Sequence, residues 1–419
     1  MFAMNLRDLL MQPPLKRRVV MGFDPANRTG CKIAVVDDTG RLLDTAVVYP
    51  TAPHKRIEEA SRELIRLINK HGVEVIAIGN GTASRESEIF VADMITENNL
   101  DVSYMVVSEA GASVYSASKL AAEEFPDYDV SLRSAVSIAR RLQDPLAELV
   151  KIDPKAIGVG QYQHDLPKAA LDDSLGGVVE DCVNSVGVNL NTASAPLLSH
   201  ISGISATVSK NIVKYRDSVG QFESRAQLLE VSKLGPKTYE QCAGFLRVLE
   251  SDNVLDNTAV HPESYDAARK LLDIFEISDE RLRSGGIPDI SKMVDEAGME
   301  SVAEKCGVGV PTLKDIISEL QKPGRDPRDE LPQPILRKDV LDISDLKPGM
   351  KLQGTVRNVI DFGAFVDIGV HQDGLVHISK LADKFVKHPS EVVRVGDRVE
   401  VTVLSVDTDR NRISLSMRD

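Results

Sequence analysis

Aromatic and basic side chains gather near the carboxy-terminal end of the chain, where their types and spacing suit contact with unpaired nucleotides. Phe362 and Phe365 flank a glycine, and His377 follows in the next apolar run. Flat rings of this kind stack on the bases of single-stranded nucleic acid, while Lys and Arg side chains follow its phosphates. The rings stand out because the chain has no Trp and only 4% aromatic residues. The alternative is that both phenylalanines are ordinary core residues.

Short strands with alternating apolar residues must position these rings. Val399, Val401 and Val403 share one face of a predicted strand, and a second strand over 412–417 alternates in the same way. Glycines punctuate the strands at the spacing of a small barrel: Gly354, Gly363, Gly369, Gly374 and Gly396. We therefore predict a β-barrel over residues 346–419.

Two strings in this segment resemble the S1 domain, an RNA-binding OB-fold. They are Asp361-Phe362-Gly363-Ala364-Phe365 and Leu375-Val376-His377-Ile378-Ser379. The resemblance implies a binding face that contains Phe362, Phe365, His377, Asp407 and Arg412, and we add Lys351 and Lys380 as candidate nucleic-acid contacts. The segment holds 11 Lys and Arg against 10 Asp and Glu, a net charge of +1, whereas the whole chain carries −13. We therefore expect modest, salt-sensitive binding.

Length and composition favour a multidomain soluble protein. A chain of 419 residues has room for about three domains, and 42% hydrophobic with 27% charged residues is ordinary for globular proteins. No apolar run reaches the roughly 18–20 residues of a membrane span, and no secretory leader is evident. Four cysteines lie far apart: Cys31, Cys182, Cys242 and Cys306. They indicate buried thiols in a cytoplasmic protein, without disulfides or zinc.

Residues 17–150 have the element order of an RNase H-like domain. Three strands, at 19–24, 31–36 and 42–49, precede helices and strands that alternate at 54–71, 73–79, 84–97 and 103–107. Such a fold cleaves phosphodiesters when about three or four carboxylates converge and hold two Mg²⁺ ions. Asp24, at the end of the first strand, and Glu109, after the last, are the candidate ligands.

The third acidic ligand of such a site is not evident in this domain. The late helix shows Arg133 and Ser134 where it is expected, and an arginine there would repel the ion. We therefore expect a scaffold without enzymatic activity or cofactor. The alternative is a Mg²⁺-dependent nuclease or resolvase that uses Asp24 and Glu109. The turn Gly79-Asn80-Gly81-Thr82 suits an ordinary strand-to-helix connection better than a phosphate-binding loop.

Residues 151–260 are predicted to form short helices with two hairpin turns, at Gly203 and Gly235. The two glycines lie 32 residues apart, near the length of one helical repeat. The segment resembles the tandem helix-hairpin-helix module of DNA-binding proteins, in which a glycine turn lets the backbone approach a phosphate. Ser205 and Pro236 stand near the positions of the second consensus glycine. Four lysines could add charge: Lys210, Lys214, Lys233 and Lys237.

The remaining segments have less specific patterns. Residues 261–321 are predicted to form additional amphipathic helices, with no chemistry that we can identify. Residues 322–345 contain four prolines among mixed charges, which indicates an extended, semi-rigid linker that lets the last domain swing.

Strings along the whole chain resemble the Tex family of bacterial transcription accessory proteins. They include Arg28-Thr29-Gly30-Cys31-Lys32, Ser108-Glu109-Ala110-Gly111-Ala112 and Gly160-Gln161-Tyr162-Gln163-His164-Asp165. The resemblance implies a multidomain architecture: a YqgF-type RNase H-like α/β domain, an all-α tandem helix-hairpin-helix region and a carboxy-terminal S1 β-barrel. Family members carry a helical region before residue 1, so we expect a fragment. Ala26 stands where the family has Gly, beside Asp24.

The sequence thus favours a non-enzymatic nucleic-acid-binding protein that acts in transcription. Single-stranded RNA is its expected partner, with duplex or single-stranded DNA as alternatives, and no membrane partner is expected. A further alternative is a docking scaffold of the transcription or translation machinery, with RNA polymerase or ribosome-associated proteins as partners.

Overall fold

The computed structural model describes residues 2–160, 166–337, 346–370, 372–383, 386–407 and 412–418. The chain divides into two compact units, one formed by Met1–Met11 with Leu146–Leu331 and the other by Gln12–Pro145 with Pro332–Asp419. Across the described ranges, no helix is long and apolar enough to cross a membrane.

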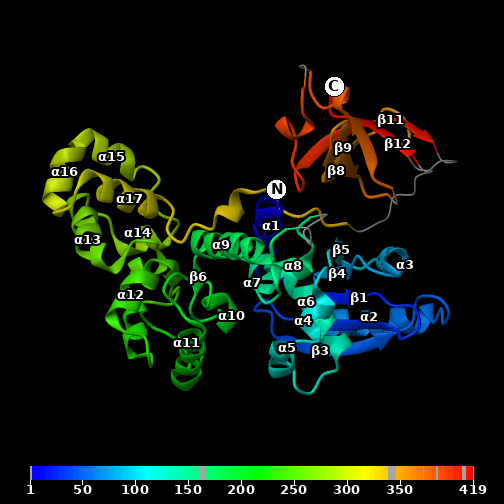
Figure 1. Ribbon diagram of the computed structural model, residues 1–419, viewed down its shortest axis with the longest axis horizontal. Helices are drawn as coiled ribbons and strands as arrows, with labels where there is room; N and C mark the ends of the chain where they lie inside the picture. Colours follow the sequence, from blue (N-terminus) through cyan, green and yellow to red (C-terminus); the bar gives the residue numbers. More distant parts are fainter. Residues whose placement is uncertain are drawn as a thin grey trace. The chain divides into compact units, whose positions relative to one another are not determined.

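Residues 12–145 of the second unit contain a five-stranded mixed sheet (Figure 1). Its strands are β1 (Val20–Asp24), β2 (Cys31–Val36), β3 (Leu42–Val48), β4 (Val75–Gly79) and β5 (Ser103–Val107), in the order β3-β2-β1-β4-β5. The first three pair antiparallel, and β4 and β5 continue the sheet in parallel. The predicted RNase H-like order of strands is confirmed.

Helices cover both faces of this sheet. They are α2 (Ile57–His71), α3 (Ser84–Glu97), α4 (Ala112–Ser116), α5 (Lys119–Glu124) and α6 (Val130–Gln143). Leu64 of α2 and Phe90 of α3 pack on one face, and Ile138 of α6 packs on the other. A side chain at Gly22 would place its Cβ 2.0 Å from a carbonyl oxygen of α6, so the glycine in β1 permits this close approach.

The helix predicted from residue 54 begins three residues later, at Ile57. Lys55 has a φ of 49°, in the left-handed region that a right-handed helix cannot include. The periodic pattern of apolar residues does not register this local backbone conformation, so the prediction placed the start too early.

The carboxy-terminal strands of the same unit close into a barrel, as predicted. They are β8 (Lys351–Ile360), β9 (Gly363–Asp367), β10 (Gly374–His377), β11 (Arg398–Asp407) and β12 (Arg412–Ser416), in the order β10-β12-β11-β8-β9. Val399, Val401 and Val403 face its core, and Met417 packs against that core while partly buried. The barrel buries alternate residues and presents the others outward.

The other unit is almost entirely helical. Its elements before residue 250 are α1 (Phe2–Leu10), α7 (Pro145–Leu149), α8 (Pro154–Ile157), α9 (Lys168–Val186), β6 (Val188–Asn189), α10 (Ala195–Leu198), α11 (Ala206–Val219), η2 (Arg225–Glu230), α12 (Pro236–Cys242), η3 (Ala243–Phe245) and β7 (Leu246–Arg247). Those after it are η4 (Val254–Asn257), η5 (Pro262–Ser264), α13 (Tyr265–Ile274), α14 (Asp279–Arg283), α15 (Ile290–Ala297), α16 (Met299–Cys306), α17 (Val310–Gln321) and η6 (Pro327–Glu330). Helices α13 to α17 enclose one apolar core.

The segment expected to be an extended, semi-rigid linker, residues 322–345, is partly folded. Pro327–Glu330 forms the short helix η6, and the buried Arg328 donates hydrogen bonds to Asp326. Further on, Arg337 pairs with Tyr104 of β5. The short helix and the backbone pairing differ from the extended conformation expected of these residues, and residues 338–345 lie outside the described residues.

Candidate nucleic-acid interface

The three predicted rings lie on the outside of the barrel. Phe362 occupies the turn between β8 and β9 and is 52% exposed. In β9, Ala364 and Val366 face the core while Phe365 faces outward and is half-buried. His377 ends β10 and is exposed. The core-residue alternative for the phenylalanines therefore does not describe this barrel.

Backbone pairing brings the rings to one region of the surface. Gly363 pairs with His377, and Leu375 pairs with Phe365. The amide of Ile378 also donates to the carbonyl of Phe362 at 2.9 Å. A Cβ at Gly363 would lie 2.2 Å from the Val376 carbonyl oxygen, so glycine permits this close pairing beside the rings.

His377 has one ring nitrogen committed within the barrel. Its Nδ1 accepts a hydrogen bond from the Ser379 amide at 3.3 Å and lies 2.9 Å from the Ser379 hydroxyl. Because the amide can only donate, Nδ1 is the unprotonated nitrogen in neutral His377, and the proton lies on Nε2. An exposed donor on a flat ring can hydrogen-bond a base or a phosphate.

The charged residues predicted for this face fall into two groups. Arg412 and Asp407 are exposed and pair with each other at the adjoining ends of β12 and β11, and Lys380 is exposed in the 3-10 turn that follows His377. Lys351 begins β8, whereas Phe365 lies opposite Asn358 near the other end of that strand and Phe362 follows its last residue, roughly 20–30 Å away along the strand. Lys351 also pairs with Glu400, so the structure does not bring it to the rings.

Asn358 joins this surface without having been predicted. It is exposed in β8 and lies directly opposite Phe365 in the register of β8 and β9. An amide side chain offers both donors and an acceptor to a base edge. The register shifts at a bulge between Val356 and Asn358, and a strict alternation of residues does not anticipate such a shift.

The residues that occupy equivalent positions in the two hairpin turns of the helical unit are not those that the sequence predicted. The first turn has its left-handed residue at Gly203 (φ 83°), and the second has it at Lys233 (φ 68°). Ser205 and Gly235 then both adopt extended backbone as the residues that precede α11 and α12. Gly235 is therefore equivalent to Ser205, and the repeat is 30 residues long, the spacing from Gly203 to Lys233, instead of 32.

The two hairpins pack against each other reciprocally. Asn211 of α11 donates to the carbonyl of Ser232 in the second turn at 2.7 Å. Gln241 of α12 lies against Gly203 in the first turn, where an added Cβ would come within 2.8 Å of it. This arrangement holds the turns side by side. Lysines near both turns are exposed: Lys210, Lys214, Lys233 and Lys237.

The side chains around Asp24 in the RNase H-like domain are not the set of carboxylates that a metal site requires. Burial raises its pKa to about 6, with a further increase from the charge of Glu109, against a hydrogen bond from Ser134 and the charge of Lys32. Lys32 pairs with Asp24 across β1 and β2, and its Nζ donates to the carbonyls of Thr29 and Gly30 at 2.8 and 2.7 Å. This buried ammonium was not predicted, although the short connection between the two strands could have indicated it.

Glu109 and Arg133 also lie differently from what a metal site requires. The Glu109 carboxylate rests against Gly81, whose added Cβ would meet its Oε1 at 1.7 Å, so it fills the space that a phosphate would need at the Gly79–Thr82 turn. Arg133 turns away and donates to the carbonyls of Phe125 and Ser116.

A Mg²⁺ pair does not fit this donor set. Such a pair needs several converging carboxylates, whereas Ser134 and the Lys32 ammonium stand beside Asp24. Within the described part of the chain, no three acidic, His or Cys side chains are grouped as metal ligands.

Models of known protein families match four segments of the chain. Residues 18–143 match the Tex protein YqgF-like domain, residues 183–247 a helix-hairpin-helix motif, residues 253–328 an HHH domain, and residues 345–418 the S1 RNA binding domain. The HHH domain was not recognised in the sequence, where most of it was predicted only as additional amphipathic helices.

Relatives match the chain from end to end. It is 55% identical over 423 residues to Protein tex of Bordetella pertussis, covering 100% of this chain and 52% of that protein. It is 55% identical over 420 residues to Transcriptional accessory protein Tex of Neisseria gonorrhoeae, covering 100% of this chain and 54% of that protein. The human S1 RNA-binding domain-containing protein 1 is 40% identical over 478 residues, covering 100% of this chain and 47% of that protein. The chain thus spans about half the length of these relatives.

Proposed function

The chain belongs to the Tex family, and we propose that it is a non-enzymatic transcription accessory protein that binds single-stranded RNA through the outer face of its barrel. Phe362 and Phe365 stack on bases, His377 hydrogen-bonds through Nε2, and Lys380 and Arg412 contact phosphates. The observation that carries the proposal is the outward placement of Phe362, Phe365 and His377 around one paired segment of β9 and β10.

The helical hairpins support a second contact, to the backbone of duplex DNA. Their exposed turns lie side by side and carry lysines, which suits binding without base readout. Because the chain is net acidic, both contacts depend on local positive charge and weaken as salt rises.

Substitution of one ring tests the RNA contact. We expect Phe365→Ala to weaken binding of single-stranded RNA by about 1–3 kcal/mol, because one stacked base is lost. Lys380→Ala should instead lower the slope of log K against log salt by about 0.7, the contribution of one phosphate contact on a single strand. Fluorescence anisotropy over a salt series, with single-stranded RNA, single-stranded DNA and duplex DNA as probes, measures both effects.

Val395→Ala is the matched control, since Val395 is 49% exposed but lies in the turn before β11, outside the strands that bear the rings. It should leave RNA affinity unchanged. Equal RNA affinity of the parent protein and Phe365→Ala would overturn the stacking proposal. If Phe365→Ala leaves the affinity for duplex DNA unchanged, the duplex is bound by another part of the chain.

A further inference from the structure

Residues just before the barrel cover the free edge of the RNase H-like sheet. Strand β5 ends the sheet order, and the backbone of Tyr104 in β5 exchanges hydrogen bonds with that of Arg337, at 2.7 and 2.9 Å. Leu336, one residue earlier, packs against the apolar cluster beneath α6. Successive residues of an extended segment point to opposite faces, so Arg337 points to the other face, where α3 lies.

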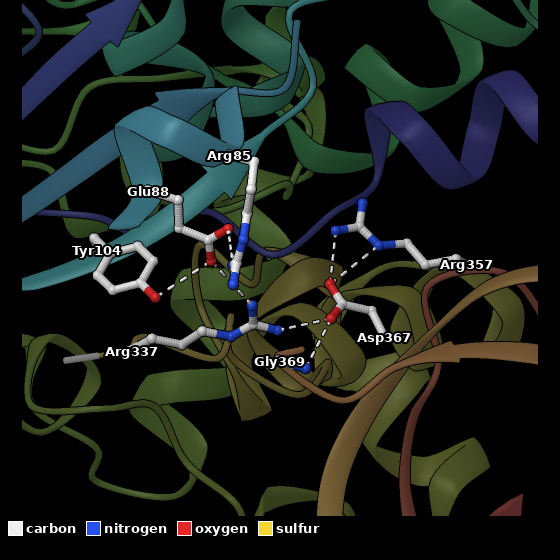
Figure 2. A network of polar contacts seen from close by, with 7 residues as sticks. All are labelled: Arg85, Glu88, Tyr104, Arg337, Arg357, Asp367 and Gly369. Atoms are coloured by element: carbon white, nitrogen blue, oxygen red, sulfur yellow. Dashed lines mark hydrogen bonds and ion pairs between the residues drawn. The ribbon is translucent and has the colours of Figure 1, made fainter. Parts of the chain in front are cut away.

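The side chain of Arg337 lies between two carboxylates from different domains (Figure 2). Its Nη1 is 3.7 Å from Oε1 of Glu88 in α3, and its Nη2 donates to Oδ1 of Asp367 in the barrel at 3.0 Å. Glu88 is itself held by Arg85, at 3.0 Å, and by the hydroxyl of the buried Tyr104, at 3.2 Å. The guanidinium therefore joins a fixed group of the RNase H-like domain to a fixed group of the barrel.

Asp367 is anchored firmly on the barrel side. It accepts hydrogen bonds from Nη2 of Arg357 at 2.7 Å and from the amide of Gly369 at 2.9 Å. Burial raises the pKa of Asp367, but the charges of Arg337 and Arg357, with these hydrogen bonds, outweigh it and hold the pKa below its ordinary value. The Glu88, Arg337 and Asp367 side chains are 10%, 22% and 12% exposed, so salt screens these pairs less than pairs at the open surface.

We propose that the barrel docks on the RNase H-like domain of the same chain through Arg337, which bridges Glu88 and Asp367. The docking surface consists of the β5 edge and α3 on one side and the Asp367 end of β9 on the other. Docking gives the barrel a defined orientation relative to the RNase H-like domain, instead of the swinging motion expected from the linker. It leaves Phe362 and His377 exposed, so the barrel presents its rings while docked.

Distance measurement between the two domains tests the dock in the complete chain. The four native cysteines are buried, so thiol-reactive spin labels attach at cysteines introduced by Asp38→Cys and Glu391→Cys, both exposed positions. We expect one narrow distance distribution in the otherwise unchanged protein by double electron–electron resonance. Arg337→Gln and, separately, Asp367→Asn should each broaden it, because each removes the link between the domains.

Arg357→Gln is the matched control because it removes another guanidinium from the same carboxylate without touching the RNase H-like domain. It should leave the distribution narrow. The proposal is overturned if the unsubstituted labelled protein already shows a broad distribution, if Arg337→Gln leaves a narrow one unchanged, or if Arg357→Gln broadens it as much. Unchanged far-ultraviolet circular dichroism in each variant establishes that a broader distribution reflects undocking and not unfolding.

Discussion

Asp24, one of the two predicted metal ligands, lies in a buried environment that raises its pKa. Its carboxyl is protonated in both the folded and the unfolded chain well below pH 3.8, and ionised in both well above about 6. Between these values the folded chain holds the proton more tightly. The raised pKa therefore reduces the free energy of unfolding as pH rises through this window, and the full cost is present at neutral pH.

Asp24→Asn should accordingly stabilise the protein at pH 7.5 by about 1–3 kcal/mol, because the amide has no charge to bury. Near pH 3.5 the gain should largely disappear. Urea unfolding followed by circular dichroism at the two pH values gives the comparison. A stabilisation of equal size at both pH values would refute the electrostatic explanation.

Asp44 supplies a control of opposite sign. Hydrogen bonds from Lys70 and His71 hold the pKa of Asp44 well below its ordinary value. Its contribution to stability is therefore present above the unfolded pKa and is lost as pH falls. Asp44→Asn should lower the free energy of unfolding at pH 7.5, whereas Asp24→Asn raises it.

Among the elements, the two hairpin turns share a backbone conformation but differ in residue type at equivalent positions. Position 203 is a glycine in the left-handed region, and its counterpart at 233 is a lysine in the same region. An L-residue other than Gly, Asn or Asp pays roughly 1–2 kcal/mol there. A strained residue with an exposed charged side chain is consistent with a role at the surface that the turn presents.

Lys233→Gly should raise the free energy of unfolding by about 0.5–1 kcal/mol, since the strain it relieves exceeds the added entropy of glycine in the unfolded chain. If Lys233 contacts duplex phosphates, the same variant should bind duplex DNA more weakly. Thermal unfolding and anisotropy in parallel separate the two effects. A variant that is destabilised would show that the left-handed turn imposes no strain.

Gly203→Ala should have the opposite effect on stability. Its φ of 83° disfavours any side chain, and an added Cβ would come within 2.8 Å of Gln241. We expect a loss of more than about 1 kcal/mol in the free energy of unfolding. Equal stability of Gly203→Ala and the parent would contradict the packing of the hairpins described above.

At the scale of the whole molecule, one buried arginine joins the two helix-hairpin-helix regions of the helical unit. Arg225, which is fully buried, precedes the junction and donates to the carbonyls of Asp256, Thr258 and Val260 beyond it. It also donates to the hydroxyl of Tyr265, which in turn donates to Asp256. Burial, together with the hydrogen bond to Asp256, raises the pKa of Tyr265, against the charge of Arg225.

Arg225→Met should destabilise the protein by about 3–5 kcal/mol, because it leaves several buried carbonyls without a donor. Arg281→Met removes only an exposed pair with Asp289 and should cost less than about 1 kcal/mol. Urea midpoints of the two variants give the test. If both variants lose the same free energy of unfolding, Arg225 does not stabilise the junction between the two regions.

The sequence predicted the elements and faces that short-range regularity controls. Because strand residues alternate, Ala364 and Phe365 had to face opposite sides, but alternation left open whether the phenylalanines were core residues. The outward face was expected only from the resemblance to the S1 domain. The layered α/β domain followed likewise from the order of its strands and helices. The hairpins were found, but their equivalence was misassigned, because a lysine occupies a backbone conformation that sequence patterns associate with glycine.

Only the tertiary structure decided which distant residues meet. Lys32 beside Asp24 depends on strand register, and Asn358 opposite Phe365 depends on a bulge. Arg337 lies between Glu88 and Asp367, residues that no local pattern connects. The periodicity of a segment reflects the free energy of burying its own apolar side chains, whereas charges pair according to where the packed segments bring them.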